Sequence, residues 1–288
     1  PATIIARGEI IKIQGGESAV ENAHEVLHEM MQTLSSKGSL SVRDVQNLIT
    51  LVKSEDSQST NTSAPDIVIH YGRKGAISPK TKGQETYVRE AGKNDIVFSI
   101  GPAGTGKTFL GVAFAVFALE NHEVDRIILS RPAVEAGENL GFLPGDLKEK
   151  VDPYLTPLYD ALSDIMPKTK LKRVLSDGSI EIIPLAYMRG RTLNNAFMIL
   201  DEAQNATPMQ MKMFLTRLGV NSKAIITGDI TQIDLPKSSD SGLIQVVNIL
   251  KGIDGIGLVK LNESDVVRHK LVQDIIRAYD KTNKMKKK

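Results

Sequence analysis

The chain has 288 residues, enough for one large α/β domain with a smaller one attached. Hydrophobic residues make up 41% and charged residues 24%, which excludes a fibrous or intrinsically disordered protein. Cysteine is absent, which excludes disulfides and thiolate metal sites, and the net charge of +2 gives little long-range attraction to nucleic acid.

Membrane and export signals are missing from the printed sequence. No run approaches the roughly 20 apolar residues of a spanning helix, and no basic segment precedes an apolar one at the N-terminus. We therefore expect a cytoplasmic protein without a membrane anchor. Because the sequence begins at Pro1, the true N-terminus can lie upstream.

Residues 1–53 are expected to form a small α/β unit. The pattern predicts a strand over 9–13, a helix over 18–34 with an apolar stripe, and a second helix over 41–53. In its pattern alone this unit resembles a KH-type RNA-binding module, although the GXXG loop is absent. A linker is expected over 54–79, where SEDSQSTNTSAP carries almost no apolar side chain.

The first helix carries His24-Glu25-Val-Leu-His28, the H-E-x-x-H pattern of zinc proteases. The two histidines flank the apolar stripe, and no later motif supplies an obvious third ligand. We therefore interpret the segment as the polar side of an amphipathic helix, and a metalloprotease ranks last among the functions considered.

Residues 80–288 predict one α/β domain, because short apolar runs alternate with helical patterns. The expected strands cover 96–100, 126–130, 180–184, 197–201, 223–227 and 256–261, and the expected helices cover 108–119, 208–218, 242–250 and 266–279. We expect a mostly parallel sheet with helices on both faces. A basic tail follows, with Lys281, Lys284, Lys286, Lys287 and Lys288.

A complete G-x-x-x-x-G-K-[ST] match lies between a predicted strand and a predicted helix. It consists of Gly101, Pro102, Ala103, Gly104, Thr105, Gly106, Lys107 and Thr108. Such a loop points backbone N–H groups at phosphates, and the lysine reaches the β and γ phosphates while the threonine hydroxyl ligates magnesium. The motif therefore predicts a P-loop NTPase that binds a nucleoside triphosphate with Mg2+.

Acidic and amide side chains follow two later strands. Asp201 and Glu202 end the apolar run AFMIL, where a Walker B element places a magnesium-holding carboxylate and a base for the attacking water. Asp229 and Gln232 follow the next strand and are candidates for sensing the γ-phosphate. The carboxyl ends of parallel strands share one edge of the sheet, so all four are expected near the P-loop.

The motif order GPAGTGKT, DEAQ, GDxxQ and DVVRH resembles the PhoH-like family, phosphate-starvation-inducible ATPases related to superfamily 1 helicases. The resemblance covers about Lys80 to Tyr279, and its most particular part is RPAVEAGENLGFLPGDLKEKVDPYLTPLYDAL from Arg131 to Leu162. It implies a RecA-like core, ATP as the nucleotide and involvement with RNA.

The resemblance also implies roles for single residues. Gln84 lies where superfamily 1 proteins read the adenine edge, and Arg268 of DVVRH matches the arginine directed at the γ-phosphate. Asp201, Glu202 and Gln204 match motif II, and Asp229 with Gln232 matches motif III. A surface glutamine at 84 and a structural ion pair at 268 stay open as alternatives.

Three further arginines, Arg131, Arg189 and Arg191, have no assigned role. Arg189 and Arg191 lie in the loop before the Walker B strand, where they are expected to face a neighbouring subunit's nucleotide, a nucleic-acid path or only solvent. Superfamily 1 helicases close two RecA domains on one ATP, whereas this chain has room for one. Movement along RNA would therefore need an oligomer, such as a hexameric ring, with arginines given in trans. The ring size and the arginine that acts in trans stay open.

The leading functional hypothesis is an ATPase coupled to RNA binding or helicase-like remodelling. The alternative is a nucleotide-dependent switch or scaffold that acts on a protein partner without stimulation by RNA. Phosphoryl transfer to another acceptor ranks below both, because the sequence shows no acceptor lid with a basic clamp. The RNA substrate, its polarity and the protein partner stay open.

Overall fold

The computed structural model describes residues 2–7, 10–37, 45, 67–132, 147–237, 240–267 and 272. Its internal contacts divide the chain into two compact units, Pro1–Pro65 and Asp66–Lys288. Among the helices described, none is long and apolar enough to cross a membrane.

The described residues 2–7 and 10–37 of the first unit form a hairpin and a helix. Strands β1 (Ala2–Arg7) and β2 (Ile10–Gly15) pair in antiparallel fashion, and α1 (Glu17–Lys37) follows. The sequence predicts β2 and α1 but not β1. The second predicted helix, 41–53, lies outside the described residues apart from position 45. The KH-type interpretation of this unit stays a prediction.

The H-E-x-x-H residues of α1 point to solvent in this structure. His24, Glu25 and His28 are all exposed. In the part of the chain that the structure describes, no group of three or more His, Cys, Asp or Glu is placed to hold a metal ion. The exposure of these three side chains is typical of the polar side of an amphipathic helix.

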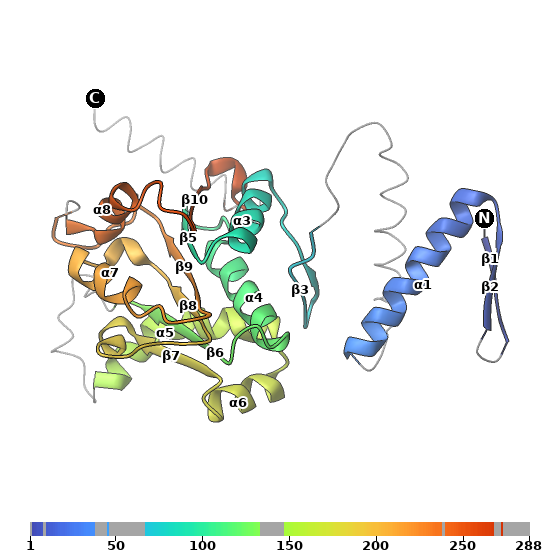
Figure 1. The fold of residues 1–288 in the computed structure, drawn as a ribbon, viewed down its shortest axis with the longest axis horizontal. Helices are drawn as coiled ribbons and strands as arrows, with labels where there is room; N and C mark the ends of the chain where they lie inside the picture. Colours follow the sequence, from blue (N-terminus) through green and yellow to red (C-terminus); the bar gives the residue numbers. More distant parts are fainter. Residues whose placement is uncertain are drawn as a thin grey trace. The chain divides into compact units, whose positions relative to one another are not determined.

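The second unit is built on a six-stranded sheet in the order β10-β5-β9-β8-β6-β7, and every pairing is parallel (Figure 1). The strands are β5 (Ile96–Ile100), β6 (Arg126–Arg131), β7 (Ile180–Pro184), β8 (Ala196–Leu200), β9 (Lys223–Gly228) and β10 (Ile256–Lys260). Each lies within one residue of its predicted bounds, and the predicted α/β fold with a parallel sheet is confirmed.

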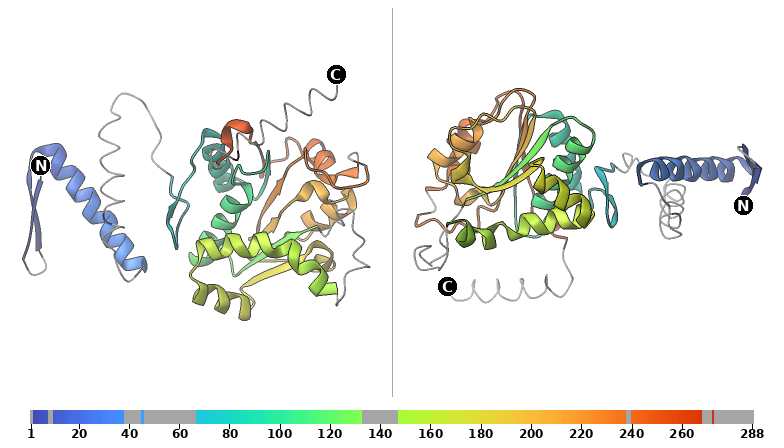
Figure 2. Two further views of the ribbon diagram at one scale, coloured as in Figure 1. Left: turned by 180° about the vertical axis from the view of Figure 1, so that it is seen from behind. Right: turned by 90° about the horizontal axis from the view of Figure 1, so that it is seen from below.

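Helices cover both faces of this sheet (Figure 2), which is why its inner strands β5, β8 and β9 are continuous apolar runs, whereas the edge strand β10 alternates buried and exposed residues. On β6, Ile127 and Leu129 face one buried cluster and Ile128 faces the other. The first cluster is covered by α3 (Lys82–Lys93), α4 (Lys107–Glu120), α5 (Leu147–Ile165) and α6 (Lys168–Ser176). The second is covered by η2 (Leu185–Met188), η3 (Ala203–Asn205), α7 (Pro208–Leu215) and α8 (Gly242–Ile249).

The second half of the predicted linker 54–79 forms a small hairpin instead. Strands β3 (His70–Gly72) and β4 (Gly75–Ile77) pair in antiparallel fashion, and Ile69 and Ile77 are buried in the first cluster. The described residues from 67 onwards therefore pack as part of the second unit. Sequence patterns missed this hairpin because three-residue strands are too short to show an alternation.

Core burial on the central strands should dominate the stability of the second unit. Leu129 on β6 is fully buried, whereas Leu258 on the edge strand β10 is 41% exposed. We expect Leu129→Ala to lower the free energy of unfolding by about 2–5 kcal/mol and Leu258→Ala by less than about 1 kcal/mol. Urea denaturation followed by circular dichroism measures both, and equal losses would contradict the described packing.

Candidate functional site

The P-loop joins β5 to α4 and is shaped by close backbone contacts. A Cβ at Gly101 would lie 2.6 Å from the Leu261 carbonyl oxygen, so a larger residue cannot replace this glycine without a backbone shift. Gly104 and Gly106 have φ of 84° and 78°, the left-handed region that glycine adopts readily. The glycines therefore serve the backbone packing and the left-handed turns that give the loop its shape.

Lys107 lies within the loop and is nearly buried. Its Nζ donates to the carbonyl oxygens of Gly101 at 2.7 Å and Pro102 at 2.8 Å. The hydroxyl of Tyr87 donates to the Lys107 carbonyl at 3.2 Å, and burial raises the pKa of that phenol, so it stays protonated as a donor. The ammonium is thus held by loop carbonyls at the start of α4.

Asp201 joins three elements at the carboxyl edge of the sheet. Its Oδ1 accepts hydrogen bonds from the Thr108 hydroxyl on α4 at 2.7 Å and from the Thr227 hydroxyl on β9 at 2.6 Å. The side chain is almost fully buried. A carboxylate beside a hydroxyl oxygen is the hard oxygen ligand set that Mg2+ prefers, so these residues fit a magnesium site.

Glu202 has an unusual backbone conformation for a non-glycine residue, with φ of 52° and ψ of 40°. Its two carboxylate oxygens have separate donors. Oε2 accepts from Gln204 Nε2 at 2.6 Å, and Oε1 lies 3.2 Å from Arg131 Nη2. A left-handed conformation costs about 1–2 kcal/mol and persists where the surroundings fix it.

Gln204 connects Glu202 to the segment after β9. Its Nε2 also donates to the Gln232 carbonyl at 3.0 Å, and its Oε1 accepts from the Asp229 N–H at 3.0 Å. Asp229 in turn accepts from the Ala103 N–H at 3.1 Å and from Gln232 Nε2 at 3.0 Å. The structure therefore brings the three predicted motifs into one hydrogen-bond network.

These side chains surround a cavity of about 300 Å3. Its lining is Ala103, Gly104, Gly106, Lys107, Thr108, Phe109, Asp201, Glu202, Gly228, Asp229 and Gln232. Backbone N–H groups, one ammonium and three carboxylates face the same space. This arrangement suits a phosphate chain with a divalent cation.

Gln84 lies on α3 beside the P-loop and is nearly buried. Its Nε2 donates to the Thr105 carbonyl at 3.0 Å, and its Oε1 accepts from the Lys80 N–H at 2.7 Å. Both ends of the amide are thus occupied by backbone groups of this chain. An adenine-reading role for Gln84 stays a prediction, and the surface-glutamine alternative is wrong.

The first residue of DVVRH, Asp265, is a structural link that sequence reasoning did not assign. It accepts hydrogen bonds from the Thr81 hydroxyl, the Gly83 N–H and the Asn262 N–H at 2.7, 3.1 and 2.9 Å. Val267 N–H then donates to the Gly104 carbonyl at 2.9 Å. Arg268 itself lies outside the described residues. The presence of Asp265 in the DVVRH motif was the only sign of this contact that the sequence carried.

The three further arginines of the sequence analysis have different environments. Arg191 makes a two-pronged ion pair with Glu181 at 2.8 Å for both contacts, and this hydrogen bonding raises the pKa of Arg191. Arg189 is exposed. Arg131 pairs with Glu202 and donates to the Tyr154 carbonyl at 3.0 Å. Sequence reasoning had no means to choose among these partners, since each pairing joins separate segments.

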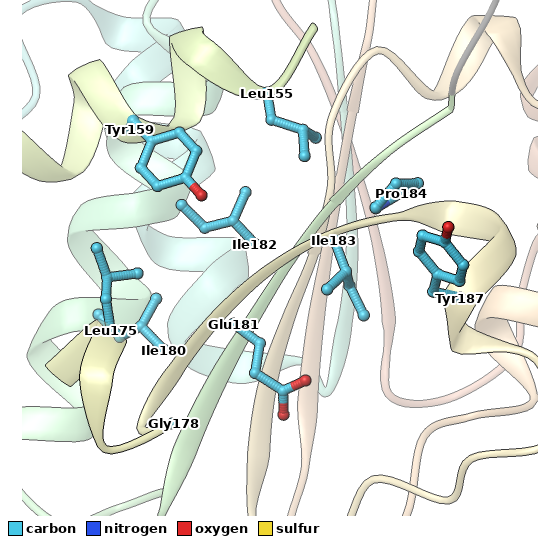
Figure 3. Close-up of a pocket in the computed structure, with 10 residues that line it drawn as sticks. All are labelled: Leu155, Tyr159, Leu175, Gly178, Ile180, Glu181, Ile182, Ile183, Pro184 and Tyr187. Atoms are coloured by element: carbon cyan, nitrogen blue, oxygen red, sulfur yellow. The ribbon is translucent and has the colours of Figure 1, made fainter. Parts of the chain in front are cut away.

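A larger hollow of about 450 Å3 runs along the edge strand β7 (Figure 3). It is lined by Leu155, Tyr159, Leu175, Gly178, Ile180, Glu181, Ile182, Ile183, Pro184 and Tyr187. Among these described residues Glu181 alone is charged, and it is already paired with Arg191. The hollow therefore offers no cation for a phosphate, and the smaller P-loop cavity is the candidate nucleotide site.

Comparison with known proteins identifies the family of the chain. Residues 76–280 match the family model described as PhoH-like protein. The chain is 53% identical over 280 residues to the PhoH-like protein of Bacillus subtilis, covering 97% of this chain and 88% of that protein. It is 45% identical over 205 residues to Protein PhoH of Escherichia coli, covering 70% of this chain and 58% of that protein.

Among solved structures, the UvsW helicase from bacteriophage T4 matches with a TM-score of 0.40 and 13% identity, over 83% of this chain and 78% of that one. The Sulfolobus solfataricus SWI2/SNF2 ATPase core in complex with dsDNA matches with a TM-score of 0.41 and 14% identity, over 69% and 47%. These distant likenesses add nothing to the site. The family match and the relatives show that the chain belongs to the PhoH-like protein family.

Proposed function

We propose that this chain binds ATP with Mg2+ and hydrolyses it, and that turnover is coupled to RNA binding or remodelling. The observation that carries the proposal is the convergence of Lys107, Thr108, Asp201 and Glu202 on one cavity. Each belongs to a motif whose chemistry is phosphate or magnesium binding. Membership of the PhoH-like family supports the same reaction.

Each cavity residue has a separate proposed role in phosphoryl transfer to water. Lys107 exchanges its loop carbonyls for the β and γ phosphates, where its charge stabilises the transition state. Thr108 and Asp201 would hold magnesium, which neutralises phosphate charge when bound. Glu202 orients and polarises the attacking water. Asp229 and Gln232 sit across the cavity and respond to the γ-phosphate through Gln204.

Coupling to RNA is the finer part of the proposal. The small N-terminal unit and the exposed Arg189 supply surfaces for RNA, while the net charge of +2 supplies little general attraction. The near-balanced charge favours the second candidate function, a nucleotide-dependent switch that acts on a protein partner. Stimulation of turnover by RNA separates the two functions.

An oligomer, such as a ring of six copies, completes the proposed site. In the described part of this chain, Arg131 and Arg191 are engaged by Glu202 and Glu181. A guanidinium for the γ-phosphate then comes from Arg268 or from a neighbouring copy.

Hydrolysis is tested by steady-state turnover with magnesium, with and without single-stranded RNA. Lys107→Ala and Glu202→Gln should each lower kcat by at least about 100-fold, because one removes phosphate charge and the other the carboxylate that polarises water. Glu202→Gln should retain ATP binding. Lys212→Ala and Glu123→Gln, which change exposed residues, serve as matched controls.

Each outcome of that experiment has a clear meaning. Turnover raised by RNA in the wild type supports an RNA-coupled ATPase. Turnover indifferent to RNA, but lost in both variants, selects the protein-partner switch. Turnover that survives Lys107→Ala contradicts nucleotide hydrolysis at this site.

Gln84 is tested by comparing ATP with GTP. If its amide reads adenine, Gln84→Ala should raise KM for ATP about tenfold more than KM for GTP, because the adenine contact is lost only with ATP, whereas the bond to Thr105 is lost with both nucleotides. Gln84→Glu, which keeps the acceptor and removes the donor, should shift the same ratio. An equal rise for both nucleotides would show that Gln84 acts only on the P-loop, through Thr105.

A further inference from the structure

We propose that Arg131 is a positioning residue that holds the Glu202 carboxylate at the nucleotide cavity and ties it to helix α5. The inference rests on the proposed ATPase function, in which Glu202 polarises the attacking water. It adds a residue outside the P-loop, Walker B and γ-phosphate motifs to the machinery of this reaction.

The sheet itself places Arg131 beside Glu202. Arg131 is the last residue of β6, which pairs in parallel with β8, and the Asp201 N–H donates to the Ser130 carbonyl at 2.9 Å. The residues after these two points therefore leave the sheet side by side. Arg131 Nη2 reaches Glu202 Oε1 at 3.2 Å, with side-chain exposures of 20% and 34%.

Glu202 needs such support to act on a water molecule. A glutamate side chain has three rotatable bonds, and one that is a third exposed can turn towards solvent. Here Gln204 holds Oε2 at 2.6 Å and Arg131 holds Oε1, so both oxygens are fixed from different sides. Preorganisation of this kind is what a general base requires, because small displacements of a reacting group slow the reaction.

Arg131 acts through Glu202 and not on the nucleotide. Glu202 is among the described residues that line the 300 Å3 cavity, whereas Arg131 and Gln204 are not. The guanidinium thus supports the carboxylate from behind. Removal of Arg131 should impair the chemical step and leave nucleotide affinity intact.

The second contact of Arg131 explains why an arginine is suited to this position. Nη1 donates to the Tyr154 carbonyl on α5 at 3.0 Å while Nη2 faces Glu202. A guanidinium presents donors on separate nitrogens in a rigid plane, whereas a lysine offers one point charge. The position of α5 is therefore transmitted to the carboxylate.

Helix α5 is also the element along the hollow at β7. Its Leu155 and Tyr159 line that hollow (Figure 3), and Leu155 follows Tyr154 directly in the chain. Pro153 and Pro157 each remove a helical N–H donor within the same stretch. A helix interrupted in this way can shift locally, and Arg131 is the described side chain that links this stretch of α5 to Glu202.

The test uses the full chain with Arg131→Ala and measures turnover and ATP binding separately. We expect kcat to fall by about 10- to 100-fold while the Kd for ATP changes by less than about twofold. Added guanidinium ion at millimolar concentration should restore part of the turnover of Arg131→Ala. The Arg131→Lys variant should have a kcat below that of the wild type, because a lysine offers a single point charge. Arg217→Ala is the matched control, because Arg217 also donates to carbonyls, those of Met213 and Arg191.

A double variant separates positioning from a general loss of structure. If Arg131 acts through Glu202, Arg131→Ala should cause no further loss of kcat in a Glu202→Gln background. Unchanged or increased kcat in Arg131→Ala, an equal loss in both backgrounds, or a weakened Kd for ATP would each overturn the inference. Full activity of Glu202→Gln alone would instead refute the proposed function.

Discussion

The candidate site depends on one buried carboxylate. Asp201 Oδ1 accepts hydrogen bonds from Thr108 and Thr227, so three segments meet at a single oxygen. An unpaired charge in this position would be costly, and two hydroxyl donors at hydrogen-bonding distance remove most of that cost. Strand β9 lies between the P-loop strand β5 and the Walker B strand β8, and Thr227 bridges that gap. This junction fixes the P-loop helix α4 and strand β9 relative to the end of β8.

Burial on both faces explains why the strands of the sheet, and through them the site, were readable from the sequence. Continuous apolar runs fixed all six strands, and carboxyl ends of parallel strands placed Asp201, Glu202 and Asp229 near the P-loop. Helix α5 was missed because Pro153 and Pro157 interrupt its helical pattern, and the three-residue strands β3 and β4 were missed for lack of length. Contacts such as Arg131 with Glu202 need three-dimensional register, which no local pattern carries.

Gln84 shows how a correct position can still leave a role open. The family resemblance implies a place for it at the adenine edge, and the structure puts it against Thr105 and Gly106 of the P-loop. Its donor and acceptor are both bonded to backbone, so adenine can be read only by exchanging one of these bonds for another. Such an exchange has a small net free energy, because a bond is lost for each one made. Adenine recognition therefore competes with the shape of the loop.

The described state balances its charges internally. Lys107 is held by loop carbonyls, Asp201 by hydroxyls and Glu202 by Arg131 and Gln204, so no cavity charge among these depends on solvent alone. In the proposed mechanism a nucleotide would replace the partners of Lys107 and Asp201, because phosphate and magnesium would compete for them directly. The partners of Glu202 lie behind the cavity and are not displaced. Control of hydrolysis by RNA or a protein partner would then act most directly on Arg131 and Gln204, since they alter the carboxylate without altering the affinity for ATP.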